Sequence, residues 1–250
     1  MHPGAHPTAV SRIMKYCLIC RQEIEDFLPF ENGFDSLHPV QKALQWVGSD
    51  IDHFYCPKCG SFDRERHLFV YLSAAPQLLQ SLHGGRILHF AAERYLSLLI
   101  ANAQPLQYVK ANIVSNDPEV EIINIERISY PDDYFDIVIA NHILEHVNDD
   151  RQAVNEVRRV LKTGGHAILQ TPYCSTLPSS ICEFTPSSLE TRTILFGQFD
   201  HVRAYGSDVF SRIAESGLRF IGGKHDRFNI SVDSRHLGIN PVEPFFLFQK

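Results

Sequence analysis

Four of the six cysteines in this 250-residue chain form two C-x-x-C pairs. Cys17 and Cys20 make the first pair, and Cys56 and Cys59 make the second, 35 residues further along (residues 21 to 55 lie between). Each pair lets two thiolates reach one ion from a tight turn, and two pairs complete a tetrahedral shell of four sulfurs. Because four cysteines fill the shell, we expect a structural zinc site with no open position; iron is the alternative ion.

Polar or small residues follow four short apolar segments, and they form the second candidate site. If the segments are neighbouring parallel strands, their carboxyl ends meet at one edge of a sheet, where doubly wound proteins bind ligands. We therefore expect one crevice there. Its candidate residues are His89, Phe90, Ala91, Ala92, Glu93, Asn112, Asn124, Ile125, Asn141 and His142.

The elements that must position these residues alternate between strand and helix. The apolar pattern predicts strands at 86–90, 108–113, 120–125, 135–140, 166–171, 218–221 and 245–248. It predicts helices at 66–82 (broken at Pro76), 95–103, 149–162 and 207–216. Such alternation indicates an α/β fold with a doubly wound, mostly parallel sheet of seven strands. The continuously apolar run FDIVIA is typical of a central strand that is covered on both faces.

The density of turn residues and the length of the apolar segments change along the chain, and these changes indicate how the chain is organised. Residues 1–13 look like a flexible tail, and Met14 is an alternative start. Residues 14–62 are short and turn-rich, which predicts a small zinc-binding module with little core of its own. Residues 63–250 form the α/β domain. Within it, residues 173–206 make too long a connection for a plain loop, and we expect an ordered lid over the ligand crevice.

Several motifs of the α/β domain resemble those of class I S-adenosylmethionine (SAM)-dependent methyltransferases. They are the strand FDIVIA, the turn LEHV and the helix end RVLKTGG. The chain is also similar to a methyltransferase type 11-like subgroup whose first motif reads LHFAPE. Here that motif is LHFAAE, and the subgroup's other segments appear as CPKC and FGQFDHVRAYG. The resemblance covers roughly residues 63–250 and implies a Rossmann-like methyltransferase fold that binds SAM at the crevice.

The chain departs from the usual methyltransferase pattern at the cofactor site. Ala91, Ala92 and Glu93 replace a glycine-rich loop, and Glu93 can accept hydrogen bonds from the ammonium group of SAM. Asn112 and Asn124 stand where the family usually has acids that bind the ribose hydroxyls and the adenine amine. An amide oxygen still accepts hydrogen bonds, but it lacks the charge that strengthens them. In the alternative interpretation both asparagines are simply turn residues.

Methyl transfer to a hydroxyl acceptor needs a base near neutral pH, and histidine suits that task. His142 follows the fourth strand, and His201 lies in the predicted lid. Asp200 can orient a histidine, and Arg203 can hold an acidic group of the acceptor through a forked pair of hydrogen bonds. The alternative is that these four residues only pack or anchor the chain, which has 13 histidines in all.

The net charge and the lengths of the apolar runs limit the possible partners. The formal net charge is −6, which argues against binding to long nucleic acid. No apolar run is long enough to span a bilayer, and the first residues lack the apolar region of a secretory signal. We therefore expect a cytoplasmic protein that does not bind membranes and acts on a small-molecule acceptor.

The leading hypothesis is SAM-dependent methyl transfer to a small-molecule or carbohydrate-like acceptor. One alternative is an RNA methyltransferase that uses the zinc module to contact RNA. Another is a catalytically silent scaffold with a methyltransferase fold, which the two asparagines at the cofactor site would favour. The sequence leaves the acceptor, the methylated atom and the oligomeric state open.

Overall fold

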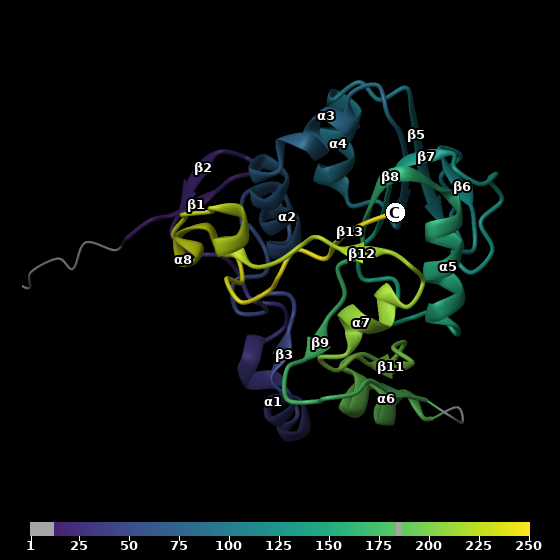
Figure 1. The fold of residues 1–250 in the computed structure, drawn as a ribbon. Helices are drawn as coiled ribbons and strands as arrows, with labels where there is room; N and C mark the ends of the chain where they lie inside the picture. The colour runs from purple at the N-terminus through teal and green to yellow at the C-terminus, as the bar shows by residue number, and fades with distance from the viewer. Residues whose placement is uncertain (1–12, 184–186) are drawn as a thin grey trace, which may run out of the picture.

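A seven-stranded sheet forms the centre of the computed structural model, which describes residues 13–183 and 187–250 (Figure 1). The strand order is β12-β13-β8-β7-β4-β5-β6. Strands β4 to β8 run parallel, and β13 lies antiparallel between β8 and β12. The strands are β4 (Arg86–Phe90), β5 (Gln107–Asn112), β6 (Val120–Ile122), β7 (Phe135–Ala140), β8 (Leu161–Ile168), β12 (Arg219–Phe220) and β13 (Leu247–Gln249). This confirms the predicted doubly wound, mostly parallel sheet.

The central strands are apolar on both faces because helices cover both faces. Side chains of β7 alternate between two clusters: Ile137 and Ile139 pack on one side, and Val138 packs on the other. All three are at most 1% exposed. Helices α2 (Asp63–Ala74), α3 (Pro76–Leu82) and α4 (Arg94–Asn102) cover the first face, while α5 (Asp150–Val160) and α7 (Val209–Ala214) cover the second (Figure 1).

Most element ends agree with the sequence pattern to within two residues; β6 ends three residues before the predicted 125, and the largest differences lie around α5 and β8. The helix predicted at 66–82 is broken at Pro76, as expected, and begins three residues earlier. The helix predicted to run to residue 162 ends at Val160, because Leu161 already has extended backbone and pairs with Phe135 of β7. A register shift in β7–β8 then accommodates Gly164 and Gly165 within β8, so these glycines do not end the helix.

The N-terminal residues and the predicted lid pack against each other. Strand β3 (Trp46–Val47) pairs with β9 (Tyr173–Cys174), and α1 (Pro39–Leu44) lies against α6 (Leu189–Phe196). The Gln41 side chain donates a hydrogen bond to the Thr193 carbonyl. The smaller elements of these two regions are β1 (Lys15–Cys17), β2 (Gln22–Ile24), η1 (Gly33–Ser36), β10 (Ile181–Cys182) and β11 (Arg203–Ala204).

The segment between β12 and β13 returns the chain to the cysteine-bearing hairpin. It contains η2 (His225–Phe228) and α8 (Ser234–Leu237), and α8 packs against β1 (Figure 1). Within residues 13–183 and 187–250, none of the helices combines the length and apolar character that a bilayer crossing requires. The predicted tail at 1–13 lies almost wholly outside the described residues, as do residues 184–186 of the predicted lid.

Candidate functional site

The two cysteine pairs meet, although 35 residues separate them in sequence. One pair lies on the β1–β2 hairpin and the other on the turn before α2, and the four sulfurs lie within 4.8 Å of one another. The Cys17–Cys59 sulfurs are 3.8 Å apart, and the Cys20–Cys56 sulfurs are 3.9 Å apart. A tetrahedral zinc site with Zn–S bonds of about 2.3 Å separates its sulfurs by about 3.8 Å. The cluster therefore fits zinc.

The surroundings of the cluster suit thiolate ligands. The Ser61 hydroxyl lies 3.2 Å from the Cys59 sulfur and 3.5 Å from the Cys17 sulfur. Burial acts to raise the pKa of the Cys59 thiol, but hydrogen bonds, chiefly those from Ser61, lower that pKa to about 7. Gly60 has φ +77°, a left-handed conformation that a side chain would strain.

A fully buried arginine, Arg66 of α2, fixes the second cysteine turn to the body of the protein. Its guanidinium stacks on the Phe27 ring, with 3.9 Å between the group and the ring centroid. It donates hydrogen bonds to the carbonyls of His53, Phe54, Ser61, Leu237 and Gly238. A zinc ion with four thiolates carries a net charge of about −2, so this buried cation also offsets charge at the cluster.

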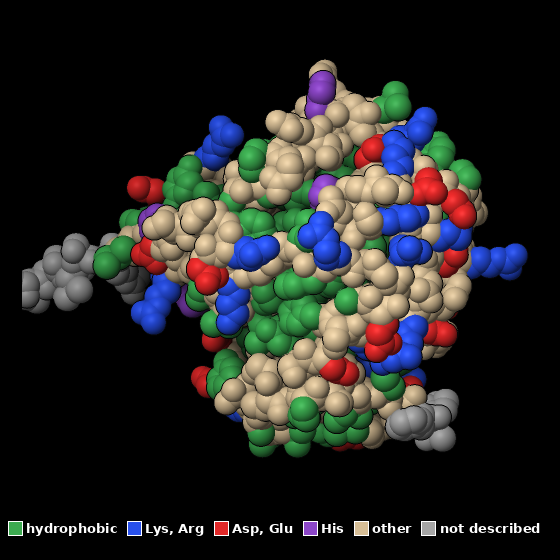
Figure 2. Space-filling view, viewed as in Figure 1, with side chains coloured by type: hydrophobic (Ala, Val, Ile, Leu, Met, Phe, Trp, Pro, Cys, Tyr) green, Lys and Arg blue, Asp and Glu red, His purple; other side chains and the backbone are tan. Residues whose placement is uncertain are grey.

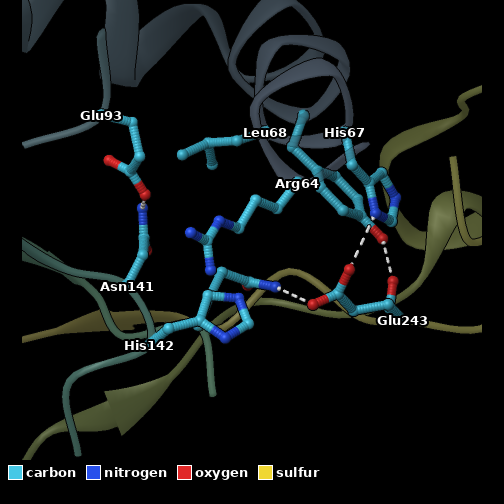
Figure 3. A pocket seen from close by; sticks show the side chains of 9 residues that line it. Arg64, His67, Leu68, Glu93, Asn141, His142 and Glu243 are labelled. Carbon is cyan, nitrogen blue, oxygen red and sulfur yellow. Dashed lines mark hydrogen bonds and ion pairs between the residues drawn. The ribbon is translucent and has the colours of Figure 1, made fainter. Parts of the chain in front are cut away.

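A second candidate site is a cavity at the carboxyl ends of β4, β7 and β8 (Figure 3). Its volume is about 10 Å³, which is room for about one water molecule. A larger ligand therefore requires the side chains of the wall to move apart. The lining residues are Arg64, His67, Leu68, Tyr71, Glu93, Asn141, His142, Gln170 and Glu243.

Three polar atoms on the cavity wall are buried without a hydrogen-bond partner among the described residues. They are Nε of Arg64, Oδ1 of Asn141 and Nε2 of His142. Buried polar groups in proteins are nearly always paired, so three orphans around one cavity indicate that a bound water or a polar ligand pairs with them. Figure 3 shows Arg64 reaching from α2 toward Asn141 and His142.

Glu93 supplies negative charge to the same wall. Its carboxylate is hydrogen-bonded to Nε2 of His89 at 2.8 Å and accepts from the Asn141 amide at 3.2 Å. Burial acts to raise the pKa of Glu93, but the hydrogen bond and charge of His89, the Glu93 backbone amide and the charge of Arg64 together hold that pKa below its usual value. The cavity thus presents an anion and a free acceptor on one side and an arginine on the other. This arrangement matches the ammonium and carboxylate of an amino-acid group.

The remaining residues predicted to bind the cofactor lie along the same edge of the sheet but do not line the cavity. Phe90 is buried at the end of β4, and Ala91, with φ +45°, begins the turn that leads through Ala92 to Glu93. Asn112 ends β5, and its Oδ1 accepts from the Ile113 amide. These residues make a strip of strand ends next to the cavity.

Asn124 has a similar local bond. Its Oδ1 accepts from the backbone amide of Glu126, two residues on, and the neighbouring Ile125 is buried. Such a bond is typical of a turn asparagine. An amide oxygen has two lone pairs, so Asn124 keeps one acceptor position free for a ligand.

Comparison with known proteins identifies this part of the chain. Residues 84–169, from the turn before β4 to the end of β8, match the family model described as a methyltransferase domain. This segment is a class I methyltransferase domain. It contains the Glu93 turn and both Asn141 and His142, so three of the residues on the cavity wall belong to it.

Two curated relatives match short stretches of the chain. One is the uncharacterized methyltransferase YcgJ of Bacillus subtilis, 44% identical over 48 residues, which are 19% of either chain. The other is the ubiquinone/menaquinone biosynthesis C-methyltransferase UbiE of Vibrio vulnificus, 39% identical over 59 residues, which are 24% of this chain and 22% of the relative. The matches thus span about a fifth of the length of these relatives.

Two solved structures align over more of the chain, at low identity. The crystal structure of YcgJ from Bacillus subtilis aligns with a TM-score of 0.43 and 15% identity, covering 71% of this chain and 94% of that chain. A SAM-dependent methyltransferase from Mesorhizobium loti aligns with a TM-score of 0.47 and 12% identity, covering 72% and 100% of the two chains.

His142 is the candidate base that borders the cavity of the methyltransferase domain. Its Nδ1 lies 3.4 Å from a carboxylate oxygen of Glu145, and its Nε2 is the orphan on the cavity wall. Burial acts to raise the pKa of Glu145, but the hydrogen bond with His142 and the nearby histidines lower that pKa to about 2. Glu145 is therefore ionised, and Thr171 donates a hydrogen bond to its other oxygen. This arrangement orients the imidazole of His142.

The other predicted catalytic residues do not line the cavity. His201 is buried beside His146, and Asp200 lies 3.3 Å from Nδ1 of His146. Arg203 is only 3% exposed, and its guanidinium donates to the carbonyls of Leu144 and Asn148. In this structure Arg203 anchors the segment to the loop after β7, which does not suit the predicted contact with an acceptor.

The predicted lid at 173–206 is likewise absent from the cavity lining within the described residues. Instead, it is tied down through Asp150, the first residue of α5. The Asp150 carboxylate receives two hydrogen bonds from Arg212, at 2.5 and 2.6 Å, and one from the Tyr205 hydroxyl at 2.8 Å. Burial acts to raise the pKa of Asp150, but the bond from Arg212 and the charge of Arg203 hold that pKa below its usual 3.8.

We expect Asp150→Asn to lower the free energy of unfolding at neutral pH by about 2–3 kcal/mol, because it weakens charge-assisted bonds to a buried acceptor. The stability that the carboxylate contributes is present above its unfolded pKa and is lost as the pH falls through the lowered folded pKa. In urea titrations, the difference in the free energy of unfolding between the wild type and Asp150→Asn should therefore shrink below pH 4. Asp132→Asn, which removes an exposed pair with Arg159, is the control and should cost less than about 1 kcal/mol. An Asp150→Asn deficit that is the same at all pH values would contradict this assignment.

Four polar cavity residues were missed by sequence reasoning: Arg64, His67, Gln170 and Glu243. Arg64 and His67, together with Tyr71, lie on one face of α2, spaced i, i+3 and i+7. That polar face was a usable signal in a helix that was predicted only to pack. Gln170 follows β8 and donates to Glu243, which lies 73 residues later in the chain. No local pattern marks Glu243.

Proposed function

We propose that this chain transfers a methyl group from SAM to a small-molecule or carbohydrate-like acceptor that carries a hydroxyl group. The supporting observation is the cavity of the methyltransferase domain, where Glu93 and Asn141 face Arg64. This charge pattern complements the amino-acid end of SAM. Strand ends of doubly wound sheets are also where such folds bind their ligands.

Three groups on the wall would hold the amino-acid end of SAM. The Glu93 carboxylate and the free Oδ1 of Asn141 would accept hydrogen bonds from the ammonium group, and Arg64 would donate to the carboxylate. Asn112 would accept from the ribose hydroxyls, and Asn124, next to Ile125, would accept from the adenine amine. Bound SAM supplies an electrophilic methyl group on its sulfonium.

His142 is the base in this proposal, and Glu145 is its positioning residue. Because Nδ1 of His142 is directed at the ionised Glu145, Nε2 is left to take a proton from an acceptor hydroxyl. The reaction needs little more from the protein than alignment of acceptor and methyl group, together with the exclusion of water. Figure 3 shows His142 directly below Arg64, so base and cofactor end share one cavity.

A small acceptor agrees with the overall charge of the chain. On the face shown in Figure 2, several Lys and Arg side chains (blue) lie in a row across the middle, with Asp and Glu side chains (red) above and below them. The net charge of the chain is −6. Nucleic-acid binding surfaces usually concentrate positive charge.

Titration calorimetry with SAM tests the proposal. We expect one molecule of SAM to bind per chain, with S-adenosylhomocysteine binding at the same site. Failure of both ligands to bind to folded protein would favour the silent scaffold and would end the enzymatic proposal. A SAM-binding protein that methylates RNA but none of a panel of hydroxyl-bearing small molecules would favour the RNA alternative.

The double substitution Asn112→Asp with Asn124→Asp should tighten SAM binding by about tenfold, because two neutral acceptors become charged ones. Calorimetry on the double variant and the wild type measures this change directly. Asp117→Asn, on the exposed loop between β5 and β6, is a charge control that should leave the affinity unchanged. Equal or weaker SAM binding by the double variant would show that these residues serve only as turn residues.

A further inference from the structure

A third group of metal-ligating side chains lies near the cavity, outside the cysteine cluster. Glu145, His146 and His201 each offer one ligand atom, and these atoms lie within 4.8 Å of one another. Glu145 and His146 come from the loop after β7, whereas His201 comes from the segment before β11, 55 residues later. The fold therefore assembles two imidazoles and one carboxylate from two separate segments.

The hydrogen bonds of both histidines leave the same nitrogen free. Nδ1 of His201 lies 2.6 Å from the Phe196 carbonyl, which can only accept, so Nδ1 carries the proton and Nε2 carries a lone pair. Nδ1 of His146 lies 3.3 Å from the Asp200 carboxylate, which favours the same tautomer. Histidines that bind metals almost always donate their second ring N–H to a carbonyl or carboxylate in this way.

The buried carboxylate of Glu145 also lacks a full positive counter-charge among the described residues. The side chain of Glu145 is 2% exposed, and within the described ranges no lysine or arginine forms an ion pair with it. Its recorded partners are Thr171 and His142, and a carboxylate has lone pairs left for a cation beyond these two. A buried carboxylate is costly unless a positive charge accompanies it.

Access and geometry allow an ion to enter. The side chain of His146 is 33% exposed, so the cluster is open to solvent on one side. A tetrahedral shell with bonds of about 2.0–2.1 Å separates its ligand atoms by roughly 3.3 Å. The ligand atoms of this cluster lie within 4.8 Å of one another, a spread that small side-chain rotations bring to that separation.

We propose that Glu145, His146 and His201 bind a divalent transition-metal ion of the kind that takes imidazole and carboxylate ligands, such as Zn²⁺ or Co²⁺. With three protein ligands, the site keeps at least one open position, unlike the four-cysteine cluster. The ion fastens the segment before β11 to the loop after β7. That loop also carries His142, so the ion stabilises the wall of the cavity.

Metal titration of the full chain tests this site, after the content of the cysteine cluster has been measured by elemental analysis. We expect the wild type to bind one further equivalent of Co²⁺, with a spectrum that lacks thiolate-to-cobalt charge transfer. His146→Gln should weaken this second binding by roughly 100-fold or more, since it removes a ligand, whereas loss of a supporting contact costs about 10–100-fold. It should also abolish the rise in melting temperature that added Zn²⁺ gives the wild type.

His53→Gln is the matched control, because His53 is 32% exposed and its Nδ1 lies 3.0 Å from Asp50. This variant should bind the second equivalent as the wild type does. His201→Gln provides a second ligand variant if it remains folded. The proposal is overturned if the wild type binds no Co²⁺ or Zn²⁺ beyond the cysteine cluster, or if His146→Gln binds the second equivalent unchanged.

A SAM titration of the same His146→Gln protein separates this proposal from the proposed enzymatic function. Retained SAM binding together with loss of the second metal supports the metal site on its own evidence. If SAM binds to neither wild type nor variant while the second metal binds to the wild type alone, the enzymatic proposal fails and the metal site stands.

Discussion

Replacing Cys56 by serine should leave the purified protein without its zinc ion and lower its melting temperature by about 10 °C. The expected shift follows from a loss of several kcal/mol, since 1 kcal/mol corresponds to about 2–4 °C in a chain of this size. The free energy of zinc binding stabilises the folded state, because the cysteines do not form a site in the unfolded chain. Elemental analysis and thermal unfolding measure the two effects.

The loss should be large because few buried apolar side chains hold the two cysteine turns to each other. The hydrophobic cluster around them contains only Cys17, Ile24, Phe27 and Cys56 as fully buried members. Cys182→Ser is the control, since Cys182 is a partly buried free thiol outside the cluster. A wild type purified without chelator and still lacking metal would contradict the zinc assignment, as would a Cys56→Ser variant that melts with the wild type.

The sheet was predictable because its signals are local. An uninterrupted apolar run such as FDIVIA needs cover on both faces, and the alternation of strands with amphipathic helices then implies parallel pairing. The end of α5 was less predictable. Leu161 and Lys162 continue the helical pattern, yet pairing of Leu161 with Phe135 draws the chain into β8 earlier. Tertiary pairing outweighed a local preference at this point.

The candidate site was predictable in part, for a related reason. Residues at strand ends are brought together by any parallel sheet, so Glu93, Asn141 and His142 could be named before the structure was known. Glu243 could not, because the loop before β13 reaches the cavity only through the antiparallel return of that strand. Arg64 was missed because the predicted helix began only at Arg66, whereas α2 begins at Asp63 and turns its polar face toward the cavity.

The role of the segment at 173–206 was harder to predict from the sequence than the strand ends were. Its length and its ionisable residues suggested a lid, but a sequence does not reveal which charges are already satisfied. Arg203 is occupied by backbone carbonyls, and Gln41 holds the Thr193 carbonyl from the N-terminal side. These long-range contacts fix the segment against α1 and the loop after β7, where His201 meets His146.

Arg64→Leu should weaken SAM binding by about 10- to 100-fold. In the proposed complex Arg64 donates to the carboxylate of SAM, and a charge-assisted hydrogen bond contributes about 1.5–3 kcal/mol, with 1.4 kcal/mol for each factor of ten. The fold should be unaffected, because leucine is a good helix former and Arg64 makes no side-chain hydrogen bond within the described residues. Calorimetry with SAM measures the change.

Arg94→Leu is the matched control for this substitution. Like Arg64, Arg94 lies in the first turn of a helix and stacks over a neighbouring ring. The Arg94 guanidinium lies 5.3 Å from the Tyr95 ring centroid, and the Arg64 guanidinium lies 5.2 Å from that of Phe62. Unlike Arg64, Arg94 does not line the cavity. A ligand control is 5′-methylthioadenosine, which lacks the amino-acid end of SAM. Arg64→Leu should leave its binding unchanged, because the adenosine half rests on the strip around Asn112 and Asn124. Equal weakening of SAM and methylthioadenosine, or no weakening of either, would show that Arg64 does not bind the carboxylate and that the charge pattern of the cavity has another purpose.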